Sequence, residues 1–263
     1  MRQLTHMIRI AALLVATTTA AHADHHGMAM GPSDSASSYS ANVALVAASF
    51  SPSQDSNMAY GGDYEGVSAG ADWSIDRYSA GASWAYYRLL RNGAEQYGVG
   101  DLSVHGQVAL LAHHDVSAGV LAALSVPTGN EVYGFGMGHP MVMPAVYGAW
   151  RNGPVELAAS FGYSRALASG THVHGMAPLV DPMNMSELSW SAGGNIAVAS
   201  GVRAGLRACG GVPVGSMPGV DRVVGAVRVA WGTARVETAA EVQGGFAGDP
   251  FNIRGVLSTA LRF

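Results

Sequence analysis

The sequence predicts an all-β protein, a transmembrane antiparallel up-and-down β-barrel of about 12 strands. Three observations support this fold class. From residue 39 onward, apolar and polar side chains alternate with period two, which is typical of strands that have two different faces. Short turns and long loops alternate between these segments, as they do in outer-membrane barrels. The chain is 49% hydrophobic and 12% charged, with 35 glycines in 263 residues, yet beyond its N-terminus no apolar run approaches the ~20 residues of a spanning helix.

Residues 1–23 are expected to be a secretory signal peptide. Two arginines flank the start of an apolar stretch, and an Ala-x-Ala cleavage site ends the segment. Residues 24–37 are small, polar and without pattern, so we expect a disordered periplasmic tail that contains His25 and His26. The barrel then comprises residues 38–263, and the mature chain, with 12 basic and 18 acidic residues, has a formal charge of −6.

Twelve segments carry the alternation, each with an apolar face for lipid and a small or polar face for the lumen. In one of the clearest, Val67 and Ala69 alternate with Ser68 and Gly70. A tilted spanning strand needs about 9–11 residues, which a chain of this length can supply twelve times with connections. The segments are residues 39–50, 67–75, 78–86, 101–110, 116–126, 141–150, 155–164, 188–198, 202–207, 222–231, 234–243 and 252–263.

The connections between the segments differ in length in a regular way. We expect the short ones to be periplasmic turns and the long ones to be external loops, so that both termini are periplasmic and the strand number is even. The short turns are at residues 76–77, 113–115, 151–154, 200–201 and 232–233. The long loops are at residues 51–63, 91–97, 127–140, 167–186, 213–221 and 244–250.

The two faces favour a membrane barrel over a soluble sandwich or a lipocalin-like barrel, because charged residues stand opposite a nearly charge-free face. We therefore expect the outer membrane as the location, with membrane lipid and lipopolysaccharide as partners. The C-terminal Phe263, after alternating apolar residues, resembles the signal that the barrel-assembly machinery recognises. Aromatic girdles are predicted near the segment ends, at Trp73, Trp84, Tyr86, Tyr163, Trp190 and Trp231.

Two short motifs resemble a known family. Gly98-Val99-Gly100-Asp101 precedes one strand, and the next strand ends in Pro127-Thr128-Gly129 before a glycine-rich loop. This pattern is similar to the Gram-negative outer-membrane family of the meta-pathway of phenol degradation, whose members are described as transporters. The resemblance covers residues from about 60 to the C-terminus and implies an outer-membrane barrel with a channel role.

Methionine and histidine gather in the predicted external loops and in the tail. Thioether and imidazole groups suit Cu(I) and Cu(II), and they persist in compartments where free thiols are oxidised. The sequence therefore raises weak copper binding as a hypothesis, against the alternative that methionine fills apolar contacts and histidine is an ordinary polar residue. The candidate metal ligands are His139, Met137, Met141, Met143, His172, His174, Met176, His25 and His26.

Charged residues on the polar faces are the candidate lining of a pore. Acids of the first half of the chain could oppose arginines of the second half across the lumen, either as a polar constriction that selects solutes by charge or as a plug. The candidates are Asp72, Asp101, His105, Glu156, Arg203, Arg207, Arg222, Arg228, Arg235, Glu237, Glu241 and Arg254.

The expected function is a channel or transporter-like protein for small solutes, with a role in copper handling. A non-conducting structural or metal-sequestering barrel is one alternative. An outer-membrane lipid hydrolase is another, resting on Ser103, His105 and Asp101, but strand spacing separates the serine and histidine by ~6–7 Å, so we expect no catalytic residues. The single cysteine and the acidic balance exclude a disulfide scaffold and a nucleic-acid partner. No cofactor is expected beyond weakly bound copper.

Overall fold

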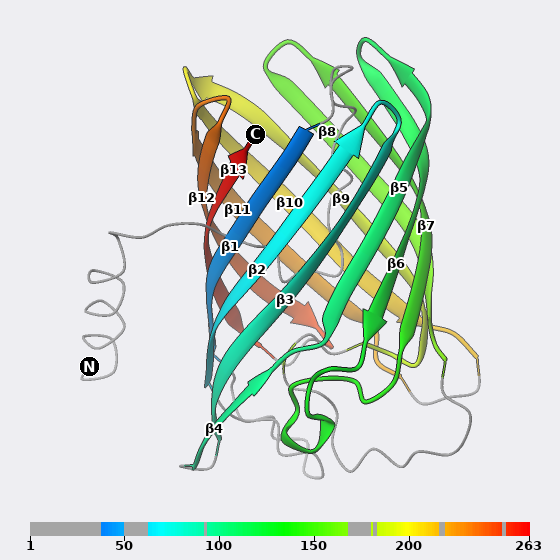
Figure 1. The fold of residues 1–263 in the computed structure, drawn as a ribbon, viewed down its shortest axis with the longest axis vertical. Helices are drawn as coiled ribbons and strands as arrows, with labels where there is room; N and C mark the ends of the chain where they lie inside the picture. Colours follow the sequence, from blue (N-terminus) through cyan, green and yellow to red (C-terminus); the bar gives the residue numbers. More distant parts are fainter. Residues whose placement is uncertain are drawn as a thin grey trace.

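The fold is a closed antiparallel barrel (Figure 1). The structure, a computed structural model, describes residues 38–49, 63–91, 94–167, 180, 183–215, 219–248 and 251–263. Its strands are β1 (Ser38–Ser49), β2 (Asp63–Ile75), β3 (Tyr78–Arg91), β4 (Ala94–Val99), β5 (Leu102–His113), β6 (Val116–Val126), β7 (Met141–Asn152), β8 (Val155–Ala166), β9 (Ser186–Ala199), β10 (Val202–Pro213), β11 (Arg222–Gly232), β12 (Val236–Ala247) and β13 (Ile253–Arg262).

Closure comes from the first strand, β1, which pairs with both β2 and β13. Leu45 is opposite Leu257 on one side and Val67 on the other, so the backbone ladder continues around the barrel. In lipid, each unpaired backbone group costs several kcal/mol, and a closed barrel removes both sheet edges. The predicted all-β up-and-down barrel is confirmed.

The strand β4 was not expected, because the sequence predicts a loop over residues 91–97. In the structure β3 continues to Arg91. β4 pairs with the C-terminal half of β3, from Tyr86 onward, and β5 pairs with its N-terminal half. Gly100 lies between the two, and its N–H donates to the carbonyl of Ala85 at 2.8 Å. β4 and β5 thus share one position in the wall, which gives thirteen strands in the twelve predicted positions.

The outer face is apolar and the inner face is small or polar. Leu206 on the outer face is 67% exposed, whereas its neighbour Arg207 on the inner face is buried. This is the reverse of a soluble barrel, because the apolar residues face the surroundings. Aromatic side chains on the outer face are exposed at Trp73, Trp84, Tyr86 and Trp231.

The two ends of the barrel differ, and we call the end that carries the long loops the mouth. The loop between β6 and β7 contains the short 3₁₀ helix η1 (Glu131–Tyr133), capped by the side chain of Asn130. Among the described residues, no helix is long and apolar enough to cross a membrane. At the opposite end, Phe263 donates its N–H to Tyr39 at 2.8 Å, so the end of the chain is paired there with the start of β1.

Candidate functional site

Most of the described charged residues that face the lumen lie on the half of the wall formed by β8 to β13. At the short-turn end, Arg203 donates to Glu156 at 3.5 Å and also pairs with Glu237. Glu237 accepts further hydrogen bonds from Arg228 at 2.9 Å and Arg262 at 3.4 Å. One carboxylate therefore joins three arginines of β10, β11 and β13.

A second chain of polar contacts runs further along this wall. Arg207 donates to Glu241 at 2.7 Å, and Glu241 also accepts from Gln243. The side-chain oxygen of Gln243 accepts a hydrogen bond from Arg254. The guanidinium of Arg254 also donates to the Tyr64 hydroxyl at 3.3 Å. Charged groups in a medium of low polarity are stable only when paired and hydrogen-bonded, and this chain supplies those partners.

A third group of polar contacts lies in this wall near the mouth. Arg222 donates to Glu187 at 2.6 Å, and Glu187 is fully buried. The other oxygen of Glu187 accepts from the Asn184 side chain at 2.7 Å, and Asn184 also exchanges hydrogen bonds with the backbone of Val220. The pair therefore anchors the two loop ends that precede β9 and β11.

The opposite half of the wall, from β1 to β7, carries fewer charged groups, and its inward neutral side chains range from serine to tyrosine and methionine. His105 lies 3.0 Å from Asp72, which also accepts from Asn42 at 3.1 Å. Gly81 stands between them, and a Cβ there would collide with Asp72 and would lie 2.7 Å from His105. The glycine is what allows these two side chains to meet.

At the mouth, Asp101 holds the loop between β6 and β7 in place. One carboxylate oxygen accepts from the Gly129 N–H and the other from the Met137 N–H, both at 2.9 Å. The Thr128 hydroxyl donates to the Gly100 carbonyl at 2.8 Å and accepts from the Leu102 N–H at 2.9 Å. The two motifs behind the family resemblance are therefore bonded to each other, and they fold this loop against the end of β5.

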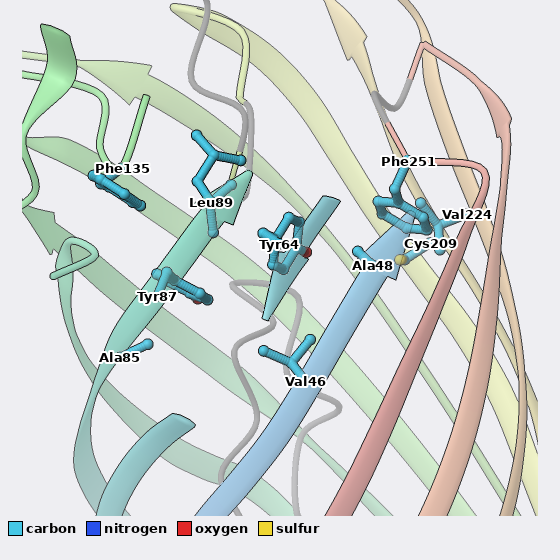
Figure 2. Close-up of a cluster of buried hydrophobic side chains, with 11 residues drawn as sticks. Val46, Ala48, Tyr64, Ala85, Tyr87, Leu89, Phe135, Cys209, Val224 and Phe251 are labelled. Atoms are coloured by element: carbon cyan, nitrogen blue, oxygen red, sulfur yellow. The ribbon is translucent and has the colours of Figure 1, made fainter. Parts of the chain in front are cut away.

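The folded loop places Phe135 in an apolar cluster inside the mouth (Figure 2). Phe135, Leu89, Tyr87 and Tyr64 are almost completely buried, and the Tyr64 and Tyr87 rings meet edge to face, 5.7 Å apart. The other members of the cluster are Val46, Ala48, Ala85, Val180, Cys209, Val224 and Phe251. This cluster therefore fills part of the barrel interior at the mouth with buried side chains.

The candidate metal ligands fall into two groups. Met137, Met141 and Met143 are buried in one cluster with Met183, and His139 in the same loop is also buried. The sequence suggests ligands along an exposed loop, but Met141 and Met143 belong to β7 and face inward. His25, His26, His172, His174 and Met176 lie outside the described residues. Within the described ranges no three His, Cys, Asp or Glu side chains gather as a metal site.

Two predicted pore-lining residues lie elsewhere. Asp101 precedes β5, and its carboxylate binds the loop backbone instead of facing a cation across the lumen. Arg235 is exposed in the turn before β12. The grouping of Ser103, His105 and Asp101 is not assembled either, because His105 pairs with Asp72 on β2.

The remaining candidates face the lumen, but their pairing differs from the expected one. Within the described residues, ion pairs join strands that are neighbours or next neighbours along the wall, and none of them joins an acid to an arginine on the opposite wall. Strands two positions apart are separated by ~10 Å, which extended Arg and Glu side chains can bridge. Sequence reasoning missed Glu187 and Arg262, although both share the alternation of inward neighbours, and it could not have joined Met183 to Met137.

The fold is similar to several solved outer-membrane channels. An outer-membrane channel from Pseudomonas putida F1 has a TM-score of 0.64 at 12% identity, covering 92% of this chain and 99% of its own. The KdgM porin has a TM-score of 0.55 at 8% identity, with 86% and 99% covered, and the NanC porin 0.56 at 9%, with 83% and 98% covered. No protein family and no curated protein sequence matches this chain. The likeness concerns the fold: this chain and these proteins share the architecture of a closed antiparallel β-barrel.

Proposed function

We propose that this protein is an outer-membrane channel for small solutes, with the mouth facing outward and a constriction formed by the loop between β6 and β7. The fold shared with outer-membrane channels and porins supports a barrel of this kind. The apolar outer face suits lipid and lipopolysaccharide as partners. Export by the N-terminal signal, and assembly through the exposed Phe263, complete the proposal.

The charge of the inner wall carries the selectivity part of this proposal. From β8 to β13, six arginines face four glutamates, an excess of two positive charges. Rings and tracks of arginine favour anions in pores. The opposite wall adds Asp72, beside His105, so the positive excess stays on one side. A small anion would follow the charged wall.

Conductance in planar bilayers tests this function. We expect the purified protein to give small, steady current steps, and a salt gradient to give a reversal potential of the sign that anions produce. An Asp101→Ala variant should give larger or more frequent steps, because its loop is less firmly held. If neither protein conducts, the alternative of a non-conducting structural barrel replaces the channel.

Copper handling is a second candidate function. The observation that favours it is the burial of four methionines in one cluster under the mouth loop. Thioethers are soft ligands that select Cu(I) among the biological metals. Capture of copper at the mouth would not require that the lumen conduct, so the two functions are separable by experiment.

A further inference from the structure

Methionine is unevenly distributed over the described part of the barrel. Five methionines lie in the described residues, and all of them belong to one corner of the mouth. Met137 is in the loop before β7, Met141 and Met143 are on the inner face of β7, and Met183 and Met185 precede β9. Apolar positions on the rest of the described inner wall hold Ala, Val, Leu, Tyr and Cys.

Four of these five side chains are packed together. Met141 is 0% exposed, and Met137, Met143 and Met183 are between 6% and 9% exposed, whereas Met185 is half-buried and lies outside the cluster. Among the partly buried hydrophobic residues that the structure describes, Ala123 and Ala166 pack against the four. A strand and two loops that are far apart in the sequence therefore bring four thioethers to one place.

A small cavity adjoins the cluster. Its volume is about 20 Å³, the space of one water molecule or one ion, and Met137 and Met183 line it. Its other lining residues include Asp101 and Ser125 together with the apolar Phe135 and Val180, and none of them is basic. A single cation in this space would lie beside the sulfur-bearing side chains of Met137 and Met183, with the acidic residue Asp101 in the same lining.

We propose that this cluster is a binding site for one Cu(I) ion, with Met137, Met141, Met143 and Met183 as the ligand set. This proposal rests on copper handling as the second candidate function, and it assigns the copper site to these residues. Sulfur ligands of this kind select Cu(I) over Zn²⁺ or Mg²⁺, which prefer imidazole and oxygen. His139, two residues after Met137 in the same loop, is also buried.

The test is a competition titration of the full-length protein in detergent, under anaerobic conditions, with Cu(I) held by a chromophoric Cu(I) chelator. Wild-type protein should withhold one more equivalent of Cu(I) than the Met137→Leu/Met183→Leu variant, or bind it at least tenfold more tightly. Leucine keeps the apolar volume, so the barrel should remain folded, and circular dichroism checks this. Met185→Leu is the matched control, because this thioether is nearby but outside the cluster.

The tail is examined separately with a His25→Ala/His26→Ala variant, which should keep the equivalent that the double leucine variant loses. Equal titration curves for wild type and the folded double leucine variant would overturn the site and leave packing as the role of the cluster. Because the titration needs no current through the lumen, a failure of the channel proposal would not affect it, and a failed titration would leave the channel proposal intact.

Discussion

The two hydrogen bonds from the mouth loop to Asp101 give a quantitative prediction. The substitution Asp101→Asn should weaken these contacts in part, and Asp101→Ala should remove them. Alanine removes both acceptors, which now bind the N–H groups of Gly129 and Met137, whereas asparagine keeps one acceptor oxygen and loses the charge. Both changes should raise the population of barrels in which the loop has left the mouth.

The magnitude follows from the two hydrogen bonds. A hydrogen bond to a charged group contributes about 1.5–3 kcal/mol, and the half-buried position of Asp101 argues for the lower value. Alanine should therefore weaken the closed loop by about 3 kcal/mol and asparagine by about 1.5 kcal/mol. These energies correspond to rises of roughly 100-fold and 10-fold in the open population, at 1.4 kcal/mol per factor of ten.

Limited chymotrypsin digestion of the detergent-solubilised barrel measures this population. Phe135 is buried in the closed loop, so cleavage after it requires opening, and its rate follows the open population when closing is faster than cleavage. Mass spectrometry separates this product from cleavage after the exposed Tyr133. Asp115→Ala, at an exposed aspartate of the opposite end, is the control. Equal rates of cleavage after Phe135 in wild type and Asp101→Ala would refute the reasoning.

Three further predictions concern the wall. Glu187→Leu should lower the free energy of unfolding by about 3–5 kcal/mol, because it leaves the Arg222 guanidinium buried without its carboxylate, and the double variant Glu187→Leu/Arg222→Met should recover much of this loss in urea unfolding. Glu241→Gln should increase anion preference and Arg207→Met should decrease it, as measured by the reversal potential under a salt gradient; a shift of the same sign in both would contradict the charged-wall argument. Val227→Arg, on the lipid face at a side chain that is 57% exposed, should cost about 2–4 kcal/mol of stability in lipid vesicles, and no loss there would place this face in water.

The sequence predicted the wall well because a strand with lipid on one side has little freedom. The alternation of Val67 and Ser68 fixes which face is outward, and a slip of one residue would expose every polar side chain to lipid. The short turns followed from the same alternation. The strand β4 escaped prediction because Asn92 and Gly93 indicate a turn, and nothing local shows that the chain then resumes pairing with β3.

The interior of the mouth was less predictable, since its contacts join segments that are distant in sequence. Asp101 has the alternation of inward Ser103, yet it stands before the strand begins and binds a loop that starts some 25 residues later. Met183 reaches Met137 from another loop, and no spacing rule relates them. The lumenal ion pairs depended in the same way on which strands are next neighbours.

The backbone pairing between β1 and β13 joins the first strand of the barrel to the last, so each needs the other for a complete set of hydrogen bonds. Every segment from β2 to β12 finds a partner that is adjacent in the sequence, but β1 waits for its second partner until the final hairpin arrives. A chain that lacks this hairpin would have two unpaired sheet edges, and each edge could pair with a strand of another protein. The pairing of β1 with β13 is therefore the step that closes the barrel, and it requires that β13 be present.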